Sequence, residues 1–581
     1  MIKSAIEHKS YSNYAFPIDE NTLKLRIKAA KNDLKSVKVI YGTRFVFDGR
    51  EPLKVKEMKL KTSSEVNDFF ETTIELEDPR FRYHFLLDDG ENKRWYNEKG
   101  FSKNRPRGGK SGFFQYSLIS NDDLLDRPDW LDEAVVYQIF PERFNNGNSD
   151  LDPANLKNWG DLPKRDSFFG GDLQGIYEKL DYLKDLGVNT IYLTPIFESL
   201  SNHKYNIDDY LKIDEHFGDE EIFEKLVNKA HDKDMKIILD AVFNHSGFNF
   251  FAFEDLRKRG ENSKYKDWYI YDSLPLQTEI PVNYETFARN IPNLPKLDTA
   301  NKEVQDYLLK VTEYWMKNFD IDGWRLDVAD EVDSSFWRRF RKKVKSLDKD
   351  AYIIGEVWHS GMKWLQGNQF DAIMNYSFTE AVIDFIAKDK IGPSEFDNRL
   401  ALNRMNYRED ITNSLLNLLD SHDTPRILRH CNEDKDKMKL AVLFQMTYPG
   451  VPMVLYGDEL GLTGGDDPDS RRCMPWDDDK ADYDLRAYYK KLIKIRKNNK
   501  ILQKGEFESF VINEAKNIYS FKRKLEDREV IVIINNNPEK REICLRSQNK
   551  NYIDLLTNKN YKNNDEKIKL VMKPYQGMIL E

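Results

Sequence analysis

The sequence predicts a multidomain protein with a central (β/α)8 TIM barrel and a β-sandwich domain on each side. At 581 residues the chain is too long for one ordinary domain. Alternating strand patterns occupy its two ends. Between them, apolar strand-like runs alternate with helical stretches, which is typical of βα units around a parallel sheet. We therefore expect domains at residues 1–122, 123–501 and 502–581.

The N-terminal part reads as a β-sandwich. Residues 22–27 and 83–87 alternate apolar and polar side chains, and Asp-Gly and Pro signals separate such runs. A polar stretch at residues 120–123 then leads into a linker.

Eight apolar runs make up the predicted barrel. They lie at residues 135–140, 190–194, 236–243, 323–328, 351–356, 372–375, 415–419 and 451–456. The gap between the third and fourth runs is the longest, and we expect an inserted subdomain there, at about residues 246–300, overhanging the site. Its aromatic side chains are Trp268, Tyr269, Tyr271, Tyr284 and Phe287.

The β pattern returns at residues 517–521, 530–534 and 578–580, which predicts a second sandwich.

Composition limits the class of partner. The net charge of −9 comes from interspersed acidic and basic residues, so we expect no nucleic-acid partner. We expect no membrane span either, and the first residues lack the apolar core of a secretory signal. Three widely spaced cysteines, Cys431, Cys473 and Cys544, favour reduced structural thiols. The expected location is the cytoplasm.

Three carboxylates follow three apolar runs: Asp327, Glu356 and Asp423. Ends of parallel strands meet at one mouth of a barrel, and glycoside hydrolysis needs a nucleophilic carboxylate and a proton-donating carboxyl. Each acid also has a structural interpretation, such as an ion pair or a helix cap. Together they indicate a sugar-cleaving site.

Neighbouring residues suggest how these acids could be tuned. Arg325 lies on the same strand face as Asp327 and would keep that carboxylate ionised. Apolar neighbours would keep Glu356 protonated as a general acid. Asp240 could anchor Arg325. Zinc binding through His245 and His422 is a competing hypothesis, although no HxH or HExxH spacing accompanies these residues.

Four stretches now resemble a known family. Residues 240–245, 323–327, 353–356 and 419–423, in this order, are similar to the conserved regions of the α-amylase superfamily, glycoside hydrolase family 13. Further matches lie at residues 187–195 and 450–459. The resemblance implies the barrel fold and a retaining mechanism on α-glucosidic bonds.

The resemblance sharpens to the neopullulanase, cyclomaltodextrinase and maltogenic amylase subgroup. Residues 294–298, Leu-Pro-Lys-Leu-Asp, are similar to its Met-Pro-Lys-Leu-Asn marker, and the N-terminal β domain precedes the barrel as it does there. Two residues depart from the pattern, Asp298 and Asp330, where the subgroup commonly has Asn. Both lie near the expected acceptor subsites, so they affect bond preference more than catalysis.

Carried over, the resemblance implies Asp327 as nucleophile, Glu356 as acid/base and Asp423 as transition-state stabiliser. Phe287, Trp358 and Tyr376 are candidate aromatic walls of the cleft, although an aromatic residue in such a barrel belongs to the core about as often as it lines the cleft. The implied substrate-binding residues are His203, Tyr205, Asp240, His245, Phe287, Arg325, Trp358, Tyr376, His422, Asp467 and Arg471.

A structural calcium site is also expected, because oxygen-bearing residues cluster after the first barrel run. An Asx-rich turn without an ion is the alternative. The expected ligands are Asn146, Asn148, Asp150, Asp152, Gly170 and Asp172.

The expected function is a retaining α-glucan hydrolase that cleaves α-1,4 bonds in cyclodextrins, pullulan and maltooligosaccharides, with α-1,6 bonds as a second candidate target and transglycosylation as a side activity. Alternatives are an oligo-1,6-glucosidase or another family 13 glucosidase or transglucosidase, and a non-catalytic glycan-binding barrel, which would be expected to lack a catalytic acid. The N-terminal domain would bind glucan or form a homodimer by lying across the partner's cleft, with Phe45 supplying an aromatic side chain to that cleft.

Overall fold

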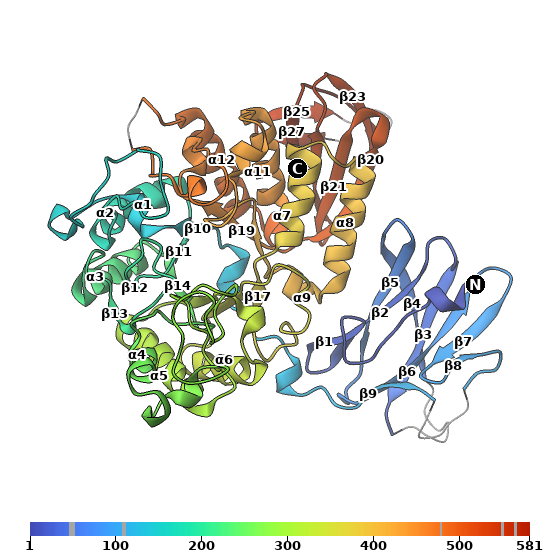
Figure 1. Ribbon diagram of the computed structural model, residues 1–581. Helices are drawn as coiled ribbons and strands as arrows, with labels where there is room; N and C mark the ends of the chain where they lie inside the picture. The colour runs from blue at the N-terminus through green and yellow to red at the C-terminus, as the bar shows by residue number, and fades with distance from the viewer. Residues whose placement is uncertain (46–52, 107–111, 477–478, 548–550, 563–565) are drawn as a thin grey trace.

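The computed structural model describes residues 1–45, 53–106, 112–476, 479–547, 551–562 and 566–581. An eight-stranded parallel sheet lies at its centre, with an N-terminal β domain to one side and a C-terminal β domain packed near helices α7, α8 and α11 (Figure 1). The predicted fold class is confirmed.

The N-terminal domain is an antiparallel sheet folded over one core. Strand β4 pairs with β3 through its first half and with β5 through its second half, so the sheet turns there. Leu25, Val39, Phe70 and Phe85, from both parts, are buried in one cluster, as in a β-sandwich. The strands are β1 (Ala15–Asp19), β2 (Thr22–Ala30), β3 (Ser36–Thr43), β4 (Lys54–Ser63), β5 (Asn67–Glu75), β6 (Phe81–Asp88), β7 (Lys93–Asn97), β8 (Gly100–Ser102) and β9 (Phe114–Tyr116).

The central sheet is a closed parallel barrel. All its strand pairs are parallel, and a parallel bridge between Met374 and Leu416 joins the two edge strands. Each of the eight predicted runs contains one strand. These strands are β10 (Val136–Ile139), β11 (Thr190–Leu193), β14 (Lys236–Ala241), β15 (Gly323–Leu326), β16 (Tyr352–Gly355), β17 (Ala372–Ile373), β18 (Leu416–Leu418) and β19 (Val451–Leu455).

Helices cover the barrel and start at side-chain caps. The carboxylate of Asp172 accepts a hydrogen bond from the Gly175 amide and begins α2, which ends at Gly187 with a left-handed φ of 102°. Asn301 and Asp333 begin α5 and α6 in the same way. The helices are α1 (Pro141–Phe144), α2 (Leu173–Leu186), α3 (Glu220–His231), α4 (Phe251–Arg259), α5 (Lys302–Phe319), α6 (Ser334–Leu347), α7 (Tyr376–Val382), α8 (Pro393–Asn406), α9 (Glu409–Thr412), α10 (Ile427–His430), α11 (Lys435–Thr447), α12 (Tyr483–Asn498) and α13 (Lys500–Lys504).

Two excursions from the barrel reach its mouth. The hairpin of β12 (Phe197–Glu198) and β13 (Asp209–Ile213) follows β11. The long segment between β14 and α5 contains α4 and is tied to the barrel by an antiparallel bridge between His245 and Lys296. In this segment the Phe287 ring stacks on His245, which follows β14, with ring centroids 5.2 Å apart.

The C-terminal domain has two sheets around one core that includes Ile531, Leu545 and Leu570. Its strands are β20 (Glu506–Asn513), β21 (Ile518–Leu525), β22 (Arg528–Asn535), β24 (Asn551–Asp554), β25 (Lys559–Lys562) and β27 (Gln576–Leu580) in one sheet, and β23 (Arg541–Arg546) and β26 (Lys567–Met572) in the other.

Within the described ranges, no helix is both long and apolar enough to cross a lipid bilayer.

Candidate active site

Adjacent strand ends bring the predicted acids to one mouth of the barrel. Asp240 on β14 lies directly opposite Arg325 on β15. Asp327 follows β15, and Glu356 follows β16. Because these strands are parallel neighbours, their carboxyl ends converge.

Arg325 is the centre of this cluster and is fully buried. Its Nη1 donates to both carboxylate oxygens of Asp240 at 3.0 Å and to Oδ1 of Asp327 at 2.7 Å. Its Nη2 lies 3.0 Å from Oε2 of Glu356. One guanidinium therefore spans three carboxyl groups and fixes their relative positions.

Two further donors orient Glu356. The Val328 amide donates to Oε2 at 2.9 Å, and the Trp358 indole Nε1 donates to Oε1 at 3.1 Å. Val328 adopts a left-handed conformation with φ 43°, which is strained for a β-branched residue. The strained turn aims its amide at the carboxyl group that follows the neighbouring strand.

Burial governs the charge of this cluster. It raises the pKa of Asp327 well above the usual range, and Arg325 opposes the shift while Glu356 and Asp240 add to it. The expectation that Arg325 alone keeps Asp327 ionised is therefore incomplete. Three carboxyl groups around one guanidinium repel one another, which favours the protonated form of Asp327.

Asp423 follows β18 and is held by two neighbours. Its Oδ2 is 3.1 Å from Nε2 of His422, and its Oδ1 is 3.0 Å from Nη2 of Arg471. Arg471 also pairs with Asp467 at 3.0 Å. Arg471 thus contacts both Asp423 and the predicted residue Asp467.

A hydrogen-bonded chain orients His422. The Gln138 Nε2 donates to Nδ1 at 2.7 Å, which places the ring proton on Nε2, 2.7 Å from the hydroxyl oxygen of Tyr205. The rings of Tyr205 and His422 are parallel within 5°. The Tyr205 hydroxyl in turn donates to Asp240 at 2.9 Å, so the His422 side of the site is linked to the Arg325 cluster.

The three imidazoles of the site are neutral near pH 7. Burial lowers the pKa of His203 to about 3 and that of His245 to about 4. It also lowers the pKa of His422 well below the usual range, with Arg471 adding to the shift. Neutral rings donate and accept hydrogen bonds, which suits sugar hydroxyls.

A cavity of about 570 Å³ opens above these groups. Asp240, Arg325, Tyr376 and His422 do not line it; they are buried beneath, and Tyr376 stacks on Trp358 with ring centroids 3.7 Å apart. The predicted residues that line the cavity are His203, Tyr205, His245, Phe287, Asp327, Glu356, Trp358, Asp423, Asp467 and Arg471.

Several residues of the site were not predicted. Gln138 is a polar residue inside an otherwise apolar strand, and that contrast was a usable signal. Lys296 bridges Glu331 at 2.5 Å and Asn244 at 2.7 Å. Asp330, which was already expected near the acceptor subsites, lines the cavity and lies 3.0 Å from His359. Other lining residues outside the prediction are Arg143, Lys164, Arg165, Asn202, Leu294, Val328 and Pro468.

The expected calcium ligands share one loop cluster but fit a cation only in part. A Cβ on Gly170 would lie 2.3 Å from Oδ1 of Asp152 and 2.6 Å from Nδ2 of Asn146, so these three residues form a cradle. Asp172, however, accepts backbone hydrogen bonds from Asn148 at 2.8 Å and Gly175 at 2.6 Å. Asp172 is therefore a helix cap, and the side-chain oxygen of Asn148 accepts from the Asp150 amide in the same local way.

The zinc hypothesis finds no support. Among the residues that the structure describes, no three His, Cys, Asp or Glu side chains form a group that could hold a metal ion. His245 and His422 instead bond to the carbonyl and the hydroxyl of Tyr205.

Comparison with protein families agrees with this geometry. The family described as "Alpha amylase, catalytic domain" matches residues 138–487, more than half of the chain. The chain belongs to the α-amylase family. It is a glycoside hydrolase of family 13. The N-terminal ig-like domain of this family matches residues 1–120, and the maltogenic amylase C-terminal domain matches residues 509–579.

Similar proteins confirm the predicted subgroup. A cyclomaltodextrinase of Thermoanaerobacter pseudethanolicus is 46% identical over 581 aligned residues, and the alignment covers 100% of both chains. Neopullulanase 2 of Thermoactinomyces vulgaris is 45% identical over 586 residues, covering 100% of this chain and 99% of that protein. A solved cyclomaltodextrinase structure covers 100% of both chains at 39% identity, with a TM-score of 0.96.

Proposed function

We propose that this chain is a retaining hydrolase of cyclodextrins, pullulan and maltooligosaccharides, with Asp327 as nucleophile, Glu356 as acid/base and Asp423 as transition-state stabiliser. The observation that carries the proposal is the single guanidinium of Arg325, which contacts Asp327 at 2.7 Å and Glu356 at 3.0 Å. Two carboxyls held on one guanidinium favour the close spacing of retaining enzymes, about 5 Å, over the wider gap that an inverting enzyme needs for water.

The proposed reaction has two steps. Glu356 gives its proton to the glycosidic oxygen while Asp327 attacks the anomeric carbon, so the C–O bond breaks and a covalent glycosyl ester forms. Glu356, now ionised, takes a proton from water, whose oxygen displaces Asp327 and leaves the sugar in the α configuration. A sugar hydroxyl in place of water gives transglycosylation.

The remaining residues would bind the substrate. Tyr205 offers an aromatic ring to a sugar, and the neutral His203 and His245 offer hydrogen-bonding groups. Asp423, held by Arg471, is placed to stabilise the positive charge of the oxocarbenium-like transition state. Phe287 and Trp358 would form walls further along the cleft.

The substrates follow from the relatives, which are named cyclomaltodextrinase and neopullulanase. Incubating the protein and an Asp327→Asn variant with β-cyclodextrin, pullulan and soluble starch, with the anomeric form of the products determined, tests the proposal. We expect α-anomeric products from the parent and a loss of at least 10³-fold in the variant. Equal activity in the variant, or β-anomers from the parent, would overturn the mechanism, and glucose released only from isomaltose would favour an oligo-1,6-glucosidase.

We propose that the protein forms a homodimer through its N-terminal domain. That domain exposes Ile18, Val55, Leu60 and Val66, which are 50%, 61%, 54% and 65% exposed, and Phe45, which is 55% exposed. Burying such side chains against a partner would be favourable. Light scattering is expected to give twice the 68.6 kDa of one chain; the mass of one chain at micromolar concentration would contradict the proposal.

We propose that Asn146, Asp152 and the Gly170 carbonyl hold a calcium ion, after the Asn146 amide turns its oxygen inward. Calcium would stabilise this loop and take no part in the reaction. Because Asp172 already serves as a cap, we expect weak binding. Calcium should raise the Tm of the parent and not that of an Asp152→Asn variant; equal responses would contradict the site.

A cytoplasmic location is also proposed. The cysteines Cys431, Cys473 and Cys544 are unpaired, and Cys544 is exposed, which suits a reducing compartment. Fractionating the source cells tests it, and recovery of the protein outside the cytoplasm would contradict it.

A further inference from the structure

Lys204 stands between two residues of the catalytic cavity but is not part of its lining. Its neighbours His203 and Tyr205 both line that cavity, whereas the Lys204 side chain is buried elsewhere, with 1% of its surface exposed. The backbone of Lys204 is left-handed, with a φ of 61°. A residue other than glycine is strained in this conformation, and such strain persists only where the surrounding structure imposes it. The contacts of Lys204 therefore have to hold this backbone in place.

The ammonium group of Lys204 is buried and paired. Its Nζ lies 2.8 Å from Oδ2 of Asp214 and donates to the Ser199 carbonyl at 3.0 Å. The ring centroid of Phe217 is 5.1 Å from Nζ. Burial lowers the pKa of Lys204, and the carboxylate of Asp214 opposes this shift. Because a charge taken out of water is tolerated only with such partners, the position of the ammonium group is fixed by them.

Asp214 connects this contact to the hairpin of β12 and β13. It follows β13, and its Oδ2 also accepts a hydrogen bond from the amide of Ser199, which follows β12, at 3.0 Å. Its Oδ1 accepts from the His216 amide at 3.1 Å. The Lys204 ammonium group therefore fastens the loop between the two strands, residues 199–208, to the residue that follows the second strand.

The next residue, Tyr205, connects this loop to the catalytic groups. Its hydroxyl donates to Asp240 at 2.9 Å and lies 2.7 Å from Nε2 of His422. Its carbonyl oxygen lies 3.1 Å from Nε2 of His245. Because Tyr205 directly follows Lys204, a change in the backbone of Lys204 would move the Tyr205 ring and these contacts together.

We propose that Lys204 is a positioning residue, whose buried ammonium group holds the loop so that the Tyr205 ring keeps its place between His422 and Asp240. The reaction that it serves rests on the proposed function. Because Lys204 does not line the catalytic cavity, its effect on the sugar passes through Tyr205.

A double-mutant cycle on β-cyclodextrin tests this role, with kcat and KM measured separately and thermal unfolding followed in parallel. Lys204→Met keeps the length of the side chain and removes its charge. The kcat should fall about 10- to 100-fold, with a smaller change in KM, because a small displacement of a group beside the reacting centre has effects of this size. In a Tyr205→Ala background, the same substitution should lower kcat by less than about 3-fold.

The matched control is Lys522→Met in the C-terminal domain. Lys522 is also buried, at 8% exposed, and pairs with Glu529 at 2.9 Å. Its substitution should lower Tm and leave kcat unchanged. If Lys204→Met does not fold, Lys204→Gly takes its place, because glycine adopts a φ of 61° without strain and has no ammonium group, so kcat should fall in the same range.

An unchanged kcat in a folded Lys204→Met or Lys204→Gly variant would overturn the positioning role, and so would an equal loss in the parent and Tyr205→Ala backgrounds. Absence of hydrolysis by the parent would refute the proposed function itself. Hydrolysis by the parent together with either of the first two results would refute only the role of Lys204.

Discussion

Gln138 is expected to act on catalysis through His422. Its Nε2 donates to Nδ1 of that ring at 2.7 Å, deep in the barrel, and so keeps the ring proton on the nitrogen near Asp423. Replacing it by Leu preserves most of the side-chain volume and removes the donor. The imidazole nitrogen is then buried without a partner, and the ring is free to change tautomer or tilt.

The size of the effect follows from this contact. A buried group left without its hydrogen-bond partner costs about 1–3 kcal/mol. If that cost falls on the orientation that stabilises the transition state, kcat/KM falls about 5- to 150-fold, since about 1.4 kcal/mol corresponds to a factor of ten. Gln138→Glu should lower kcat/KM further at acid pH, because a carboxylate beside the ring favours its protonated form.

The assay is kcat/KM on β-cyclodextrin with thermal unfolding measured in parallel. Gln445→Leu is the matched control: Gln445 is equally buried and donates to the carbonyls of Asn417 and Met453, away from the cavity lining. It should lower Tm with little change in kcat/KM. Equal losses of kcat/KM in Gln138→Leu and Gln445→Leu would refute the positioning role.

Two further outcomes are expected elsewhere in the chain. Trp358→Phe keeps the stack on Tyr376 but removes the donor to Glu356, so kcat should fall about 3- to 10-fold, and an unchanged kcat would show that this bond does not matter. The hydrogen bond to Asp322 raises the pKa of His231 above its usual value, so its contribution to stability is complete below about pH 6.5 and is lost as the pH rises through the raised pKa. In the His231→Gln variant, Tm should therefore fall less steeply above about pH 6.5 than in the parent. Parallel pH profiles of Tm in the variant and the parent would contradict this account.

Sequence patterns could predict the strand ends but not the contacts between them. Apolar runs that finish at Asp327 and Glu356 indicate where each strand delivers its acid. That Arg325 lies opposite Asp240 depends on the register of two strands far apart in the sequence. The same limit hid Gln138, whose partner His422 lies 284 residues further along the chain.

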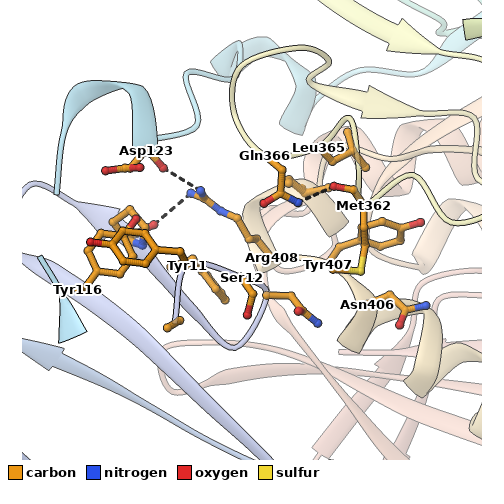
Figure 2. Close-up of a pocket in the computed structure, with 15 residues that line it drawn as sticks. Tyr11, Ser12, Tyr116, Asp123, Met362, Leu365, Gln366, Asn406, Tyr407 and Arg408 are labelled. Carbon is orange, nitrogen blue, oxygen red and sulfur yellow. Dashed lines mark hydrogen bonds between the residues drawn. The ribbon is translucent and has the colours of Figure 1, made fainter. Parts of the chain in front are cut away.

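Competing interactions explain why the predictions for the calcium site and for the charge of Asp327 were incomplete. Asp172 stands among oxygen-bearing residues, yet the helix that starts beside it uses its carboxylate as a cap. Burial likewise offsets the effect of Arg325 on Asp327, and burial depends on the whole barrel. The cavity that Tyr11 and Gln366 line between the N-terminal domain and the barrel (Figure 2) has no sequence signal, because it forms only when the two domains pack.

The central claim is that Asp327 forms the covalent bond to the sugar. Incubation with 5-fluoro-α-maltosyl fluoride, which slows release of the intermediate, followed by intact-protein and peptide mass spectrometry tests it directly. The account predicts one fluoromaltosyl group per chain, attached to the peptide that contains Asp327. No adduct, or an adduct on Glu356, would contradict it.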